Sequence, residues 1–222
     1  MPTTTLQIIA ARLKQQKANK QGSTVLFLGA GASISAGIPS AAGVMEKMET
    51  DEFYCELIQN ATGKTYAGYM SCLESNDRKR LIDGYIAEAK INPAHLYAAH
   101  LIAKGYIDCV VTTNFDPLIL RALALYNTFP AVYDLTTMRD RVTNSFDFPA
   151  VLFLHGQNHG FYQMNTPDEM KEPVEAIRQA FVKISLNRSW LVVGYSGNDP
   201  VFEQLASISK FGDGLYWAGY KE

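Results

Sequence analysis

Short apolar runs that alternate with helical stretches constrain the fold of this chain most strongly. The first run, Thr24–Leu28, is continuous, too short for a helix and bounded by glycine, which is typical of a strand buried on both faces. Further strands are expected at Ile107–Thr112, Pro130–Tyr133, Ala150–Leu154, Trp190–Gly194 and Leu215–Trp217. Because helical stretches separate these strands, the pattern predicts an α/β fold in which a parallel sheet carries helices on both faces.

Helical periodicity fills most of the remaining chain. Residues 5–18 read as an amphipathic helix, with Leu6, Ile9, Ala10 and Leu13 at helical spacing. Three further helices are expected, at Asp116–Leu125, Pro173–Leu186 and Pro200–Ser209.

The stretch from about 44 to 104 is helical throughout, with breaks expected near Gly63 and near Ser75-Asn76-Asp77. Its last helix is well delimited, since Asn92 is a capping residue, Pro93 suits the first turn and Gly105 follows the end. The stretch is too long for a simple crossover between parallel strands. We therefore expect part of this helical insert to form a small cap module within one domain over residues 1–222.

Composition excludes several classes of protein. The 20 Lys+Arg and 22 Asp+Glu give a formal net charge of −2, and no basic run indicates nucleic-acid binding. The longest apolar runs fall far short of the about 20 residues of a membrane span, and the first 20 residues lack an export signal. Cys55, Cys72 and Cys109 form no CxxC pair, so reduced thiols of a cytoplasmic protein are expected. The ending LYWAGYKE suggests the N-terminal domain of a longer protein.

Four of the expected strands end in small, polar or potentially catalytic residues. The segments are VLFLGAGAS (25–33), VVTTNFD (110–116), VLFLHG (151–156) and LVVGYSGND (191–199). Ligands of an open parallel sheet bind outside the carboxyl ends of its strands. The pattern therefore predicts one binding site assembled from four strand ends.

The first of these segments has the features of a phosphate loop. Gly29 and Gly31 permit close approach of the backbone, and the helix start that follows offers N–H groups to a pyrophosphate, at about 0.3–1 kcal/mol per contact. Ile34 replaces the third glycine of GxGxxG and no GK[ST] follows, so neither the dinucleotide fingerprint nor a P-loop is present. A plain tight turn remains the alternative. The next helix is expected to begin at Pro39.

The second and third segments supply groups for chemistry. Asn114 offers both a donor and an acceptor, suited to a ribose hydroxyl or a water, whereas Asp116 suits hydroxyl binding or capping of the next helix. His155 is expected at a strand exit, where an imidazole with the ordinary pKa near 6.5 suits a general base; a structural role is the alternative. The other three histidines, His95, His100 and His159, are interpreted as surface or packing residues.

The fourth segment combines close approach with polar groups. Gly194 allows close approach of the backbone, and Ser196 suits hydroxyl or phosphate contact. Asn198 and Asp199 precede the helix that starts at Pro200, so capping of that helix is their alternative role.

Together, and in this order, the four segments resemble the sirtuin family, and more closely the sirtuin-like domains of bacterial antiviral defence proteins. GAGASISAGIPSA resembles the GAGxSxxxGIP phosphate loop, TTNFD is similar to the T-x-N-x-D element, and LHG is similar to the element that carries the base. VGYSGND stands where sirtuins have G-T-S. The resemblance spans about residues 23–217 and implies a Rossmann-like sheet with a small helical module and NAD as the ligand.

Two departures from the sirtuin pattern bear on the reaction. Deacylases continue GIP with an acidic or polar residue, Phe and Arg, whereas Ser40-Ala41-Ala42-Gly43 follows here, and their four-cysteine zinc module has no counterpart in a chain of three cysteines. The resemblance therefore favours the defence branch, which cleaves NAD itself. The implied activity is that of an NAD+ glycohydrolase that needs no metal and releases nicotinamide and ADP-ribose.

The resemblance also implies roles for individual residues. Asn114 orients the ribose and water, and His155 acts as the base. The pyrophosphate and the rest of ADP-ribose fall to Gly29, Ala30, Gly31, Ser33, Pro39, Asp116, Gly194, Ser196 and Asn198. Regulation by oligomerisation or by an activating partner is expected, because unregulated loss of NAD is toxic.

Three other functions stay open on the sequence. One is a non-catalytic sensor of NAD or ADP-ribose, and another is an NAD-dependent protein deacylase. Dehydrogenase-like chemistry is disfavoured. It needs an acidic residue that binds the ribose from a strand end about 20 residues after the glycines, and the acidic residues near that spacing, Glu49 and Asp51, sit in a helical stretch.

Overall fold

The structure is a computed structural model that describes residues 4–19, 23–137, 145–160, 162–166, 168–171, 173–208, 211 and 214–219. Six parallel strands form one sheet in the order β3-β4-β2-β1-β5-β6. The strands are β1 (Thr24–Leu28), β2 (Ile107–Thr112), β3 (Ala131–Asp134), β4 (Ala150–Phe153), β5 (Trp190–Val193) and β6 (Leu215–Ala218). The predicted strands are confirmed, with shifts of one residue at some ends.

Register brings the carboxyl ends of the central strands to one edge of the sheet. Leu28 is the partner of both Thr112 and Val193, and Thr112 is in turn the partner of Phe153. Every residue of β1 and β4 is buried. Such burial on both faces explains why these strands are continuous apolar runs in the sequence.

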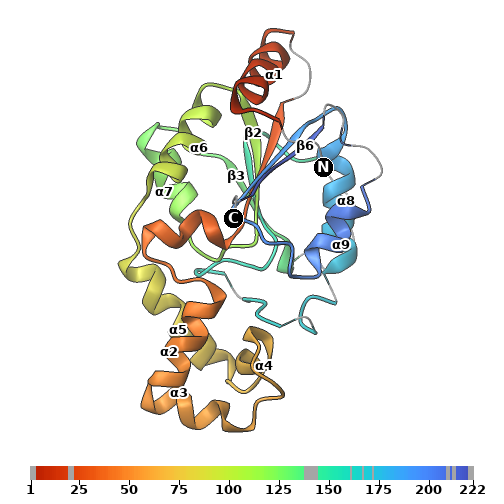
Figure 1. Cartoon of the computed structure of the whole chain (residues 1–222). Coiled ribbons are helices and arrows are strands. Elements are labelled where there is room, and N and C mark those ends of the chain that lie inside the picture. Colours follow the sequence, from red (N-terminus) through yellow and green to blue (C-terminus); the bar gives the residue numbers. More distant parts are fainter. Residues whose placement is uncertain are drawn as a thin grey trace.

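Helices cover both faces of the sheet (Figure 1). On one face, α6 (Pro93–Ala103) and α7 (Leu118–Leu125) enclose a core with Leu26, Val110 and Phe153. On the other, α8 (Val174–Ser185) and α9 (Val201–Ala206) pack over a second core. The predicted Rossmann-like α/β fold is thereby confirmed. The expected end of the last helix, Ser209, lies outside the described residues.

Helix α1 (Leu6–Ala18) forms where the apolar spacing predicted it, with Thr5 as its N-cap, but much of its apolar side is exposed. Leu6 is 81% exposed, and the one buried residue of the helix is Gln16. The Gln16 amide donates to the Ser189 hydroxyl at 2.9 Å, and its oxygen accepts from the Thr24 hydroxyl at 3.0 Å. Polar contacts at the amino end of the sheet thus anchor the helix.

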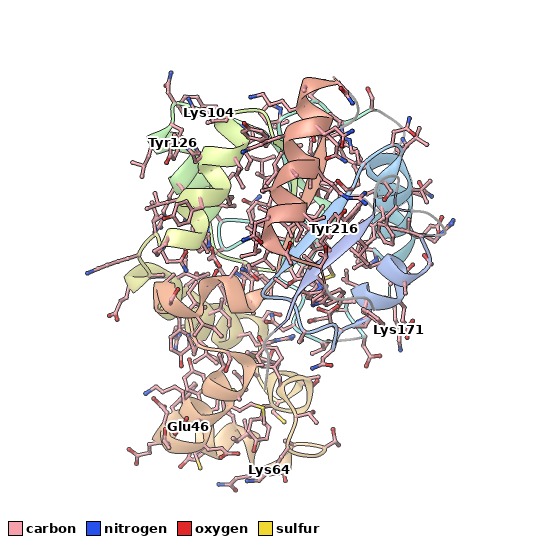
Figure 2. All side chains as sticks on the ribbon, turned by 45° about the horizontal axis from the view of Figure 1, so that its top comes forward. Glu46, Lys64, Lys104, Tyr126, Lys171 and Tyr216 are labelled. Atoms are coloured by element: carbon pink, nitrogen blue, oxygen red, sulfur yellow. The ribbon has the colours of Figure 1, made fainter. Side chains whose placement is uncertain are left out.

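The helical module stands apart from the sheet at one end of the molecule and carries Glu46 and Lys64 (Figure 2). It comprises α2 (Ala41–Thr50), α3 (Glu52–Leu57), η2 (Ile58–Asn60), α4 (Tyr66–Ser71) and α5 (Ser75–Glu88). These helices share a core of their own that includes Val44, Met48 and Met70. The chain enters it from η1 (Ala30–Ala36), a 3₁₀ helix that ends at Gly37.

The helical insert breaks near Gly63 and just before Ser75-Asn76-Asp77, as predicted. Ser75 begins α5, and Asp77 sits in its first turn, where a carboxylate stabilises the helix start. Helix α6 is capped by Asn92 as predicted and packs on the sheet, so the module is the part of the insert that precedes it. One detail differs: helix α2 begins at Ala41 and not at Pro39, because the Ser40 hydroxyl accepts the Gly43 N–H.

No helix in the described part of the chain is long and apolar enough to cross a membrane.

Candidate functional site

The loops after β1 and β5 touch at the point where the strand order reverses. The Gly29 N–H donates to the Val193 carbonyl at 3.0 Å, and the Gly31 N–H donates to the Gly194 carbonyl at 2.8 Å. A Cβ on Gly29 would lie 2.5 Å from the Tyr195 Cα, closer than real side-chain contacts allow. These glycines therefore allow one backbone segment to approach another, and their N–H groups are committed to carbonyl oxygens of the chain.

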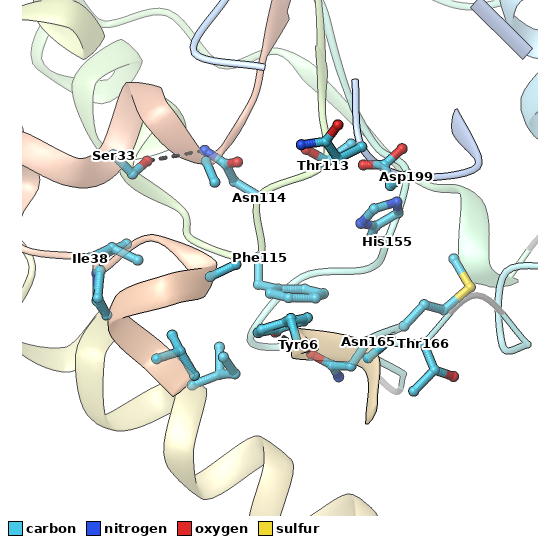
Figure 3. Close-up of a pocket in the computed structure, with 18 of the residues that line it drawn as sticks. Ser33, Ile38, Tyr66, Thr113, Asn114, Phe115, His155, Asn165, Thr166 and Asp199 are labelled. Carbon is cyan, nitrogen blue, oxygen red and sulfur yellow. Dashed lines mark hydrogen bonds between the residues drawn. The ribbon is translucent and has the colours of Figure 1, made fainter. Parts of the chain in front are cut away.

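A cavity of about 460 Å³ opens beside these loops (Figure 3). Its volume lies in the range of roughly 300–1,000 Å³ that is usual for small-molecule and cofactor sites. Eight of the eleven site residues predicted from the sequence line it, namely Ala30, Ser33, Pro39, Asn114, Asp116, His155, Ser196 and Asn198. The three glycines, Gly29, Gly31 and Gly194, lie behind that lining and set the loop geometry.

The Asn114 side chain is held by its amide nitrogen. Nδ2 donates to the Gly29 carbonyl and to the Ser33 hydroxyl, both at 3.1 Å. The opposite atom, Oδ1, is buried and has no hydrogen-bond partner among the described residues. An unpaired buried acceptor costs about 1–3 kcal/mol, and a ligand that brings a donor to this oxygen would remove that cost.

A buried polar network lies beneath Asn114. The Ser33 hydroxyl donates to Asp116 Oδ2 at 2.8 Å, and Asp116 Oδ1 accepts the Leu118 N–H at 3.0 Å. Both carboxylate oxygens of Asp116 are thus engaged within the chain, one of them at the start of α7. The capping alternative considered for this residue is the one that the geometry favours, and it explains why α7 begins at Leu118 instead of Asp116.

His95 belongs to this network, although its sequence context predicted a surface or packing residue. Its Nε2 lies 3.4 Å from the Ser33 hydroxyl, and its side chain is buried. Burial lowers the pKa of His95, and the nearby Asp116 carboxylate opposes that shift. No local pattern marks this role, because Ser33 and His95 lie 62 positions apart in the sequence.

His155 faces the same cavity at the end of β4, with Asp199 beside it (Figure 3). The imidazole is 9% exposed, and its Nε2 is buried without a partner among the described residues. Burial lowers the pKa of His155, and the Asp199 carboxylate partly offsets this effect. The neutral ring that results is the form that accepts a proton.

In the segment after β5, some residues order the start of the next helix and others line the cavity. Asp199 Oδ1 accepts from the Tyr195 hydroxyl at 2.6 Å and from the Val201 N–H at 2.9 Å, so this carboxylate orders the start of α9. Ser196 and Asn198 are exposed and line the cavity. Asp199 lines the cavity too, so it takes part both in ordering the start of α9 and in lining the site.

The other half of the cavity is largely apolar and was not predicted. The helical module contributes Val44, Tyr66, Ile82, Tyr85 and Ile86, and the loop that leads into it contributes Ile38. The chain after His155 contributes Met164, Asn165, Thr166 and Met170. In the sequence, apolar residues at helical spacing look the same whether they pack in the core of the module or face the cavity. The sequence therefore does not distinguish the residues that line the cavity from those of the module core. Among the described residues, no group of three or more His, Cys, Asp or Glu could hold a metal ion.

Comparisons with known proteins bear on this site. The family model of the SIR2-like domain matches residues 108–218. A sirtuin structure solved to explain substrate affinity is 17% identical, with 96% of this chain and 87% of that chain covered and a TM-score of 0.53. A Sir2 homologue in complex with NAD is 15% identical, with 96% and 83% covered and a TM-score of 0.50. At these identities the likeness shows a shared fold. No curated protein matches the sequence significantly.

Proposed function

This chain belongs to the SIR2-like domain family, and from that premise we propose that it is an NAD+ glycohydrolase, which cleaves the bond between nicotinamide and ribose. The observation that carries the proposal is a pair of buried, unpaired polar atoms in one cavity. Asn114 Oδ1 and His155 Nε2 both lack partners among the described residues, and both side chains line the cavity at the strand ends. A cavity that binds no polar ligand would gain nothing from two such costly groups.

The two groups suit the chemistry of this hydrolysis, whose transition state has oxocarbenium character and needs water at the anomeric carbon. The Asn114 oxygen accepts a hydrogen bond from a ribose hydroxyl or from the water, while the contacts of its Nδ2 fix its direction. Neutral His155 accepts the proton of the water or of a ribose hydroxyl. General-base assistance of this kind contributes about 10²–10⁴-fold to the rate.

Fewer residues can contact the phosphates than the sequence predicted. The N–H groups of Gly29 and Gly31 are directed at carbonyl oxygens, and the Ser33 hydroxyl donates to Asp116. We therefore propose that Ala30, Ser196 and Asn198, which line the cavity, contact the phosphates. In this proposal Ser33 and Asp116 hold Asn114 in place.

The test is to mix the full-length protein with NAD+ and quantify nicotinamide and ADP-ribose. We expect His155→Ala and Asn114→Ala to lower turnover at least 100-fold, with the exposed His100→Ala as the matched control. Wild-type protein that binds NAD+ without releasing nicotinamide would instead be a sensor. Nicotinamide release that requires an acylated peptide would identify a deacylase.

We further propose that the activity depletes NAD+ in the cytoplasm of bacteria during phage infection, and that a partner or self-assembly restrains it until then. The four motifs and their resemblance to antiviral defence proteins support this proposal. The measurement is cellular NAD+ after infection, with His155→Ala as the inactive control. Equal NAD+ levels in infected cells of both strains would contradict it.

A further inference from the structure

One wall of the cavity is attached directly to the backbone of His155. Met164, Asn165 and Thr166 line the cavity, and we call residues 163–166 the wall segment. The Met164 N–H donates to the His155 carbonyl at 2.9 Å, and Gln163 pairs with Gly156 in an isolated antiparallel bridge. A displacement of the wall segment therefore displaces the end of β4 from which the imidazole projects.

A single carboxylate holds the wall segment from its other side. Glu169 Oε2 accepts the N–H of Asn165 at 2.8 Å and the N–H of Thr166 at 3.0 Å. Burial alone would raise the pKa of Glu169, but these two amides and Arg78 outweigh it and lower the pKa. The carboxylate is thus charged near neutral pH, and charged acceptors make the stronger hydrogen bonds.

The helical module supplies the counter-ion. Arg78 Nη1, on α5, donates to Glu169 Oε1 at 2.6 Å, and the two side chains are only 15% and 16% exposed. On α4, the Tyr66 hydroxyl donates to Asn165 Oδ1 at 3.1 Å. One contact from the module therefore reaches the wall segment directly, through Tyr66, and the other reaches it through Glu169. Exposed ion pairs such as Arg178–Glu175, in contrast, link residues of one helix.

We propose that Glu169, held by Arg78, is a positioning residue that keeps the wall segment ordered and thereby couples the helical module to His155. The proposal rests on the function proposed above, since the site that it orders is the NAD+ site. Without the pair, the amides of Asn165 and Thr166 are held less firmly until a ligand binds, and the cost of ordering them appears as weaker apparent affinity. KM for NAD+ then rises, while the saturated enzyme retains its kcat.

Hydrogen exchange and kinetics test the proposal on Arg78→Met and Glu169→Gln in the full-length protein. We expect the amides of Asn165 and Thr166 to exchange at least tenfold faster, and KM to rise at least tenfold with kcat within threefold. The matched control is Arg188→Met, which breaks a partly buried pair with Asp108 (3.0 Å) at the amino end of the sheet. Partial unfolding lowers the concentration of active enzyme, so it would lower the apparent kcat and leave KM unchanged. We expect Arg188→Met to leave KM unchanged, and the rise in KM therefore separates positioning from instability.

Two further variants sharpen the test. Arg78→Lys keeps a donor and should recover KM to within threefold of wild type. The exchanged pair, Arg78→Glu with Glu169→Arg, restores the charges but gives the two amides no acceptor, so we expect no recovery. Recovery by the exchanged pair would overturn the proposal, as would unchanged amide exchange in Arg78→Met or unchanged KM despite faster exchange. If wild-type protein releases no nicotinamide, the proposed hydrolase fails, and amide exchange with the Kd for NAD+ still decides the role of the pair.

Discussion

Gly194 offers the sharpest test of how the two central loops are built. Its φ is +68°, and a Cβ there would lie 2.3 Å from the Ala32 nitrogen and 2.7 Å from the Gly31 carbonyl carbon. Alanine in the left-handed region costs about 1–2 kcal/mol. The clash must in addition push the loops apart, which breaks the 2.8 Å hydrogen bond from the Gly31 N–H to the Gly194 carbonyl.

Gly105 provides the matched control for that substitution. Its φ of +69° is nearly the same, but a Cβ there would meet nothing within 4 Å. Gly105→Ala therefore carries the conformational cost alone, and the loss of unfolded-state entropy is the same in both variants. The difference in stability between the two variants therefore measures the cost of the close approach alone. That cost is about 0.5–1.5 kcal/mol for the lost hydrogen bond and about 1–3 kcal/mol for overpacking.

Urea denaturation of both variants measures the difference directly. We expect Gly194→Ala to lower the free energy of unfolding by about 2–4 kcal/mol more than Gly105→Ala does. Because the loop of Gly194 leads to Ser196 and Asn198, we also expect at least tenfold weaker NAD+ binding in Gly194→Ala alone. Equal losses of stability in the two variants would refute the argument that backbone contact fixes this glycine.

The remaining predictions concern pH and the far end of the sheet. Burial lowers the pKa of His155, so kcat/KM should stay level as pH falls to about 6.5 and decline only below it, with an apparent pKa below the ordinary value. The same shift means that the folded state binds fewer protons than the unfolded chain, so the free energy of unfolding decreases as pH falls through about 6.5. A decline of kcat/KM that begins above pH 6.5 would contradict this reasoning. Gln16→Ala leaves the hydroxyls of Thr24 and Ser189 without their amide partner, so thermal denaturation should show a loss of about 1–3 kcal/mol. NAD+ turnover should be unchanged by Gln16→Ala, since the residue lies at the opposite end of the sheet; a large fall would indicate coupling between the two ends.

Local patterns were sufficient wherever one segment carries all the information. Strands β1 and β2 were predicted with their observed bounds, because burial on both faces makes them mostly apolar over a length too short for a helix. The cap of α6 was predicted because Asn92 and Pro93 act on their own helix. The order of the four motifs predicted the sirtuin superfamily, which the match over residues 108–218 confirms.

Contacts between segments that are distant in the sequence could not be predicted from local patterns. The ion pair between Arg78 and Glu169 joins residues 91 positions apart, so neither side chain has a local pattern that distinguishes it from a surface charge.

The chain's own order of residues determined the sheet and brought an amide and an imidazole to neighbouring strand ends, because parallel strands share one carboxyl edge. Only the tertiary structure decided what each group does there. It directed the amides of Gly29 and Gly31 at the chain itself, left Asn114 Oδ1 and His155 Nε2 unpaired, and closed the cavity with the helical module. The reason is physical: hydrogen bonds and burial depend on which surfaces meet, and that is settled by packing across the whole fold.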